Sequence, residues 1–185
     1  SRSALIAAAG TDAPLPFRLL ALRALANLTC METNVVPMWR HGAMRENLIF
    51  NVDAFNAGTA GDADIMGHHA DCSNHALRAF ANLATFEEVQ EEMLAMEPVA
   101  RVLIAAAVPK RCTNPGAEVS ARVQALRTLA NLACTAAARR VLWKGTTLRT
   151  SISENARVDQ PQEVREQALR IMANITSADA DEAQG

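Results

Sequence analysis

The chain has 185 residues, and half of them are apolar, which excludes a chain that is disordered throughout. Its net charge of −2 excludes a general electrostatic attraction to nucleic acid or to an anionic membrane. Aromatic residues make up only 4% and tyrosine is absent, a composition that favours closely packed helices over a β-sandwich.

Four segments of the chain have nearly the same sequence. They are ALRALANLTC (21–30), ALRAFANLAT (76–85), ALRTLANLAC (125–134) and ALRIMANITS (168–177). Their asparagines, Asn27, Asn82, Asn131 and Asn174, are separated by intervals of 55, 49 and 43 residues. Repeats built from two or three helices have periods of roughly 40–47 residues. We therefore predict a helical repeat with extra length in the first two intervals.

Apolar periodicity and helix-breaking residues predict three helices in each complete repeat. The expected helices span 32–40, 43–51 and about 71–85, then 87–96, 98–108 and 115–134, and finally 136–144, 147–158 and 161–177. A Gly- and Asp-rich loop is expected before the helix at 71. The chain is thus predicted to be one domain, 1–185. Its parts are the end of a truncated repeat (1–30), a repeat with a long insertion at 52–70 (31–85), two further repeats (86–134 and 135–177) and a tail (178–185).

The extra length can be assigned to one connection. Leu48, Leu103 and Ile152 each follow the preceding Asn of the motif by 21 residues and lie in apolar patches. The variation therefore falls between these positions and the next motif. A stack of repeats tolerates insertions in one loop because the packing faces stay in place.

An Asn-bearing third helix with the pattern A-L-x-x-L-x-N-L, preceded by two shorter helices with a glycine between them, resembles the armadillo repeat of β-catenin, importin-α and the vacuolar armadillo protein. The resemblance covers nearly the whole chain. It implies an all-α fold, a right-handed superhelical solenoid of three-helix repeats.

The resemblance also implies that Asn27, Asn82, Asn131 and Asn174 hold the backbone of an extended peptide along the concave groove. An amide side chain both donates and accepts hydrogen bonds, so it can pair with a peptide unit. Asparagine is a poor residue inside a helix, and its recurrence needs a reason. The alternative is that each Asn bonds within the repeat and binds nothing.

Four arginines, Arg23, Arg78, Arg127 and Arg170, each precede the Asn by four residues and so share a helix face with it. Importin-α carries Trp near this point, whereas Trp39 and Trp143 of this chain fall in predicted first helices. A groove lined by guanidinium groups is expected to prefer acidic or phosphorylated segments. The alternative is that these arginines pair with glutamates of neighbouring repeats or only solubilise the surface.

The first insertion contains a polar cluster that we interpret as a solvated loop and not as a metal site, because it lacks a recognised ligand spacing. It comprises Asp62, Asp64, His68, His69, Asp71, Cys72 and His75. Phosphate-loop and nucleophile-elbow motifs are absent. No catalytic residue, metal or cofactor is therefore predicted, and the chain is not expected to be an enzyme.

The preferred function is a protein-interaction scaffold that binds an extended, acidic peptide segment of another protein. The alternatives are a regulatory arm of a multidomain enzyme and a structural spacer in a cytoskeletal or ciliary assembly. Nucleic acid and a membrane span are not expected, and the oligomeric state is not predicted. Scattered cysteines indicate reduced thiols in the cytoplasm or nucleus. The start at Ser-Arg-Ser suggests that both ends are cuts in a longer protein.

Overall fold

A computed structural model describes residues 1–57, 63–109 and 115–182, and within these ranges the chain is all-α, with no strand. Eleven helices lie in this part of the chain: α1 (Arg2–Ala8), α2 (Leu15–Leu28), α3 (Glu32–Trp39), α4 (Gly42–Asn56), α5 (Ala63–Leu83), α6 (Glu87–Ala95), α7 (Glu97–Ala107), α8 (Pro115–Leu132), α9 (Ala136–Lys144), α10 (Thr146–Asn155) and α11 (Gln162–Glu182). Over the same residues, no helix is both long and apolar enough to cross a membrane.

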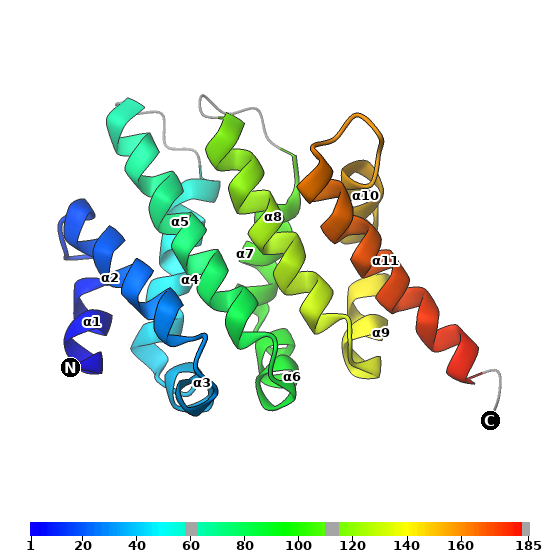
Figure 1. Cartoon of the computed structure of the whole chain (residues 1–185), viewed down its shortest axis with the longest axis horizontal. Coiled ribbons are helices and arrows are strands. Elements are labelled where there is room, and N and C mark those ends of the chain that lie inside the picture. Colours follow the sequence, from blue (N-terminus) through cyan, green and yellow to red (C-terminus); the bar gives the residue numbers. More distant parts are fainter. Residues whose placement is uncertain (58–62, 110–114, 183–185) are drawn as a thin grey trace.

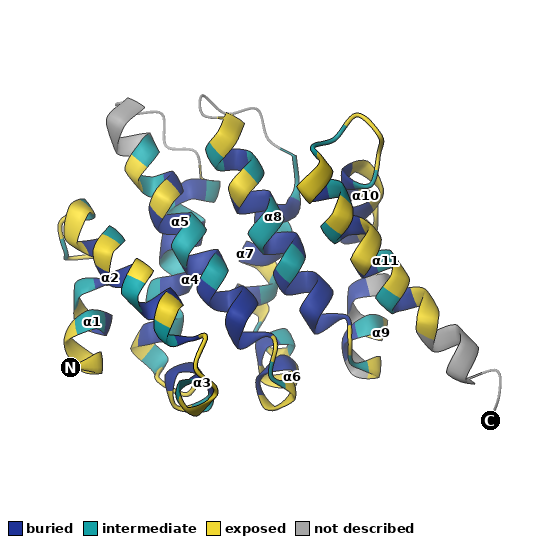
Figure 2. Ribbon diagram, in the orientation of Figure 1, coloured by how far each residue is buried: buried dark blue, intermediate teal, exposed yellow. Residues whose placement is uncertain are grey.

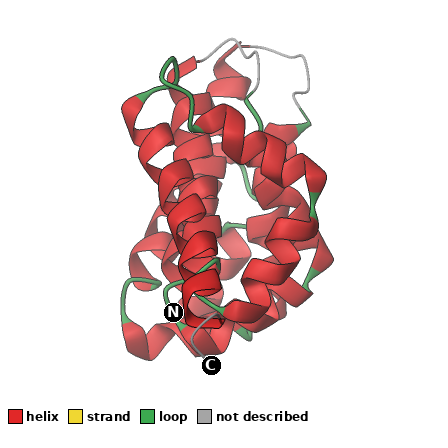
Figure 3. Ribbon diagram, turned by 90° about the vertical axis from the view of Figure 1, so that its right-hand side faces the viewer, coloured by secondary structure: helices red, strands yellow, loops and turns green. Residues whose placement is uncertain are grey.

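The helices are arranged in a pattern that recurs along the molecule. The four motif-bearing helices, α2, α5, α8 and α11, lie side by side in one layer, and α1, α4, α7 and α10 lie behind them in a second layer (Figure 1). The short helices α3, α6 and α9 follow one another along the lower edge of the array (Figure 1). Seen from the side, the helices form two columns (Figure 3).

Close packing of the front layer follows from the small residues of the motif. Ala21, Ala76 and Ala125 are nearly or fully buried, and the leucines that follow them, Leu22, Leu77 and Leu126, are 0% exposed. Small side chains let neighbouring helix backbones approach, and the adjacent leucines belong to the same buried core. Burial is therefore densest in the motif halves of α5 and α8 (Figure 2).

The long loop predicted over 52–70 is largely helical, so the prediction that the third helix begins near 71 was wrong. α4 continues to Asn56, and α5 already begins at Ala63. Val52 and Phe55 extend the buried face of α4, and Ala70 extends that of α5, so the insertion lengthens two helices that the core already holds. Residues 58–62 of the insertion lie outside the described residues.

The remaining predicted helices agree with the structure to within about three residues at most ends. α10 ends at Asn155 and not at 158, and α11 continues to Glu182 through much of the predicted tail. The expected division into three helices per repeat agrees with the order α3–α5, α6–α8 and α9–α11.

Candidate binding surface

The recurring asparagines connect each motif helix to the one before it. Asn82 Nδ2 donates to Ala26 O at 3.0 Å, Asn131 Nδ2 to Ala81 O at 2.9 Å, and Asn174 Nδ2 to Ala130 O at 2.9 Å. In every case the acceptor is the carbonyl of the alanine directly before the Asn of the preceding motif. The same hydrogen bond therefore occurs between all three pairs of neighbouring motif helices.

Each of these carbonyls lies in the last turn of its helix, and Ala26 O also accepts from Thr29 Oγ1 at 2.8 Å. In a continuing α-helix the Cys30 N–H would reach Ala26 O, but it donates to Asn27 O at 3.2 Å. Cys134 N–H likewise turns to Asn131 O. Carbonyls freed at a helix end must be satisfied by side chains or water. Each Asn thus caps the C-terminal end of the preceding motif helix.

Capping leaves little of the Asn side chains for a ligand in the middle of the array. Asn82 is 7% exposed and Asn131 is 5% exposed, whereas Asn174 is half-buried and Asn27 is exposed. Asn82 Nδ2 also has Thr29 Oγ1 and Cys30 Sγ within 3.2 Å, so both of its hydrogens have acceptors. Peptide binding by the Asn row stays a prediction, and Asn82 would have to give up one of these contacts to donate a hydrogen bond to a ligand.

The arginines are the accessible part of the motif. Within 76–84 and 125–133 every residue is buried except Arg78 and Arg127, which are half-buried. Arg23 and Arg170 on the outer motif helices are exposed. Arg78 donates through Nη2 to Asn27 Oδ1, so it also spans two repeats. In the described residues no ion pair involves Arg23, Arg127 or Arg170.

Positive charge is concentrated where α5 meets α2. Burial and the nearby charges of Arg78 and Arg23 hold the pKa of His75 below its ordinary value of 6.5, although Asp71 acts in the opposite sense. His75 therefore carries no charge at neutral pH, and the guanidinium groups dominate the local field. A hollow between α5 and α8 continues this surface and is lined by Asp71, Asn74, His75, Arg78, Ser120 and Gln124.

A second set of asparagines, which the sequence analysis missed, caps the rear layer. Asn51 Nδ2 of α4 donates to Ala9 O of α1 at 3.2 Å, and Asn155 Nδ2 of α10 donates to Ala107 O of α7 at 2.8 Å. Both asparagines are 0% exposed. Each lies three residues after the apolar position that aligns the repeats, Leu48 or Ile152, and this spacing is the signal that could have revealed them.

One buried ion pair was also missed. Arg122 Nε lies 3.1 Å from Glu118 Oε1 on α8, and its Nη1 donates to Asn155 Oδ1 and Gln160 Oε1. Arg122 is 4% exposed. The network joins α8 to α10 and to the connection before α11, so its position is structural.

In the described part of the chain, the polar cluster of the first insertion does not form a metal site. Among the described residues, no group of three His, Cys, Asp or Glu side chains could hold a metal ion. Burial raises the pKa of the Cys72 thiol to about 11, so it stays protonated, and burial also lowers the pKa of His69. Asp62 and the side chain of Asp64 lie outside the described residues.

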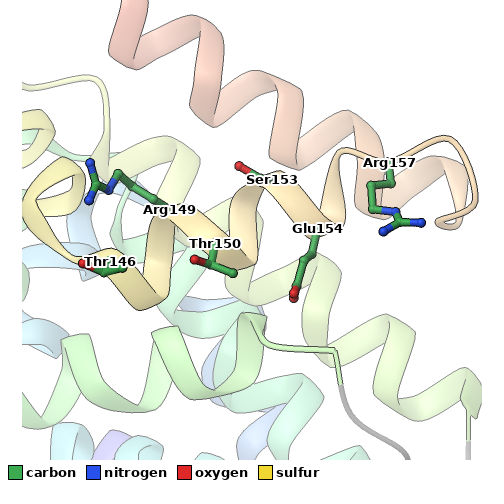
Figure 4. Close-up of a pocket in the computed structure, with 6 residues that line it drawn as sticks. All are labelled: Thr146, Arg149, Thr150, Ser153, Glu154 and Arg157. Carbon is green, nitrogen blue, oxygen red and sulfur yellow. The ribbon is translucent and has the colours of Figure 1, made fainter.

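A further hollow lies on the outer side of α10 (Figure 4). Thr146, Thr150 and Glu154 follow one another along the helix, and Arg149 and Arg157 stand toward its two ends. Hydroxyls and charges of both signs share this open surface, and no nucleophile–base pair is present in it. It offers no chemistry beyond ordinary surface contacts.

No model of a protein family matches the chain, and no curated protein matches it. Among solved structures, it is similar to an engineered protein whose crystal structure came from the Northeast Structural Genomics Consortium, with a TM-score of 0.63 and 20% identity over 95% of this chain and 62% of that chain. The chain thus spans less than two thirds of that protein. A second engineered protein from the consortium aligns over 96% of this chain and 99% of that chain, with a TM-score of 0.33 and 17% identity. The first likeness concerns the helical fold alone.

Proposed function

We propose that the chain is an armadillo-type solenoid with a right-handed superhelical stack of three-helix repeats. Its function is to bind an extended, acidic or phosphorylated segment of another protein across the layer of motif helices. The observation that carries the proposal is the row of four arginines, one on each motif helix. In the two central motifs, Arg78 and Arg127 are the only residues of the buried stretches 76–84 and 125–133 that reach the surface.

The spacing of the arginine row suits an extended ligand. Packed helices lie about 8–10 Å apart, and an extended chain advances about 3.3 Å per residue. A peptide that crosses the layer would therefore pass one arginine about every third residue. Acidic residues at that spacing match the row, and a guanidinium group pairs well with carboxylate or phosphate.

The strength of such binding can be bounded. A hydrogen bond to a charged group contributes roughly 1.5–3 kcal/mol, and a micromolar complex needs roughly 8 kcal/mol. Three or four arginine contacts together reach this range, and fewer do not. The proposal therefore requires a ligand long enough to cross at least three of the motif helices.

The test is a titration with fluorescent peptides of about 12 residues, which is long enough to cross the layer. The peptide with Glu at every third position is expected to bind more tightly than an isomer of equal charge with its Glu residues clustered. Phosphoserine in place of Glu should strengthen binding. Equal affinities for the two isomers would mean that only net charge is sensed, and the proposal would fail.

A pair of arginine variants locates the site. Arg127→Gln is expected to weaken binding roughly 10- to 100-fold, as expected for one charge-assisted contact. Arg101→Gln is the matched control, because Arg101 is exposed on α7 in the other layer and already pairs with Asp53 at 2.7 Å. Similar losses in the two variants would place the peptide elsewhere.

A structural spacer is the second candidate, and one observation favours it. The donors of Asn82, which a groove-binding ligand would use, are already engaged with α2. A spacer predicts that no acidic peptide of either spacing binds and that the chain responds to Asn substitutions only through its stability.

A further inference from the structure

The hollow between α5 and α8 carries opposite charges at its two ends. Asp71, His75 and Arg78 line it from α5, and their spacing places them on one face of that helix. At 1.5 Å per residue, Asp71 and Arg78 lie about 10 Å apart along the helix. His75 stands between them, and its lowered pKa keeps it uncharged at neutral pH. A ligand in the hollow therefore meets a cation at one end and a carboxylate at the other.

The hollow also offers hydrogen-bond acceptors that have no partner. Asp71 is exposed, and its carboxylate makes no hydrogen bond or ion pair with any described residue. Asn74 Oδ1 and Gln124 Oε1 likewise lack a hydrogen-bond partner in the described part of the chain. The terminal torsion of an amide side chain is broad, so both oxygens can turn toward a donor placed in the hollow. A carboxylate and two amide oxygens together suit a cationic group with several N–H donors.

The size of the hollow suits a single side chain. Its volume is about 280 Å³, slightly less than the roughly 300–1,000 Å³ of pockets that enclose a whole small molecule. Arg78 lines one end of it, and the proposed peptide would pass this arginine as it crosses from α5 to α8. A long side chain from the residue next to that crossing can extend along the hollow toward Asp71.

We infer that the hollow is a subsite for a basic side chain of the bound segment, which carries this residue between two of its acidic residues. Arginine fits better than lysine, because its five N–H donors form a planar fork that can reach the carboxylate and the amide oxygens together. The acidic ligand residue that pairs with Arg78 neutralises that end of the hollow, so Asp71 then dominates the local field. The inference rests on the proposed function, since it concerns another residue of the same ligand.

The experiment places one arginine in turn at each position between the glutamates of the Glu-spaced peptide. Each peptide is compared with its citrulline counterpart, which has a similar shape without the charge. Arginine reduces the negative charge of the peptide, so attraction to the arginine row alone predicts weaker binding at every position. The subsite predicts the opposite at one position, where arginine should bind about 3- to 5-fold more tightly than citrulline, as expected for an exposed ion pair.

A pair of variants locates the effect. Asp71→Asn should remove the preference for arginine over citrulline, and it should leave the fold intact because Asp71 is exposed. Glu88→Gln is the control and should keep the preference. It removes an exposed carboxylate from α6, which follows the opposite end of α5.

The outcomes separate this inference from the proposed function. If the citrulline peptides bind but arginine gives no advantage at any position, the inference is overturned and the proposed function stands. If the preference persists in Asp71→Asn, the arginine lies elsewhere and the inference is again overturned. If the Glu-spaced peptide itself does not bind, both fail.

Discussion

The same ten-residue motif has different surroundings in the middle and at the ends of the molecule. In α5 and α8 it is buried almost completely, and its last-turn carbonyls accept hydrogen bonds from the next repeat (Figure 2). In α2 and α11 the same positions are partly exposed, at Asn27 and Leu169. The sequence of the motif is nearly constant, so burial here is a property of stacking and not of the helix itself.

The largest expected effect comes from truncating the repeated leucine at the two kinds of position. Leu126→Ala removes a fully buried side chain and should lower the free energy of unfolding by about 2–5 kcal/mol. Leu169→Ala changes a half-exposed side chain and should cost about 1 kcal/mol or less. Urea unfolding at a concentration where the chain is monomeric measures both. Equal losses would show that a neighbouring repeat does not decide the burial.

A smaller difference is expected between the asparagines. Asn131→Ala leaves the carbonyl of Ala81 without its side-chain donor in a buried position and should cost about 1–3 kcal/mol. Asn27→Ala removes no capping bond to a described residue, only the exposed acceptor of Arg78 Nη2, and should cost about 1 kcal/mol or less. Both substitutions gain the same helix propensity, so the difference between them reports the capping bond. A loss of similar size in both would contradict the capping role.

The stability of the chain should depend on pH through a position of α5 that carries a titratable side chain, whereas the aligned position of α2 does not. His75 has a lowered pKa in the folded chain, whereas Leu20 occupies this position in α2. The unfolded chain binds the proton of His75 more tightly than the folded chain does. His75 therefore does not reduce the free energy of unfolding above pH 6.5, but it lowers this free energy as the pH drops from there through the lower folded pKa. Urea midpoints at about pH 8 and about pH 5 should therefore differ less in His75→Gln than in the unmodified chain. The same difference in both would assign the effect to another group.

The smallest perturbation is a chemical label on the thiols. Cys72 lies buried against α2 with a pKa raised to about 11, whereas Cys30 and Cys134 are exposed at the ends of their helices. Brief alkylation near neutral pH, followed by peptide mass mapping, should label Cys30 and Cys134 and spare Cys72. Fast labelling of Cys72 would mean that α5 separates from α2 easily.

Much of the fold could be predicted from the motif, because Ala and Leu at fixed distances from Asn define a helix face that must be buried. The insertion could not, since its Gly and Asp residues indicate a loop while Val52, Phe55 and Ala70 are held by contacts far away in the sequence. Tertiary burial outweighs local propensity at such positions.

The binding surface was only partly predictable. The face shared by Arg and Asn follows from their four-residue spacing. Their spacing does not tell which of the two side chains is free for a ligand and which caps the preceding helix. Whether Asn131 points to a ligand or to Ala81 depends on where the preceding helix ends, and a single motif contains no information about that. The rear asparagines, Asn51 and Asn155, were missed because they lack a flanking pattern as clear as A-L-x-x-L.

The asparagines and arginines of the motif are assigned different roles, capping and ligand binding. This assignment can be tested by measuring unfolding and peptide binding on the same two variants. Asn131→Ala should lower the free energy of unfolding by about 1–3 kcal/mol and leave the Kd for the Glu-spaced peptide unchanged. Arg127→Gln should raise that Kd and leave unfolding nearly unchanged. The reverse pattern, in which Asn131→Ala abolishes binding without loss of stability, would mean that the asparagines hold the ligand and do not cap the helices.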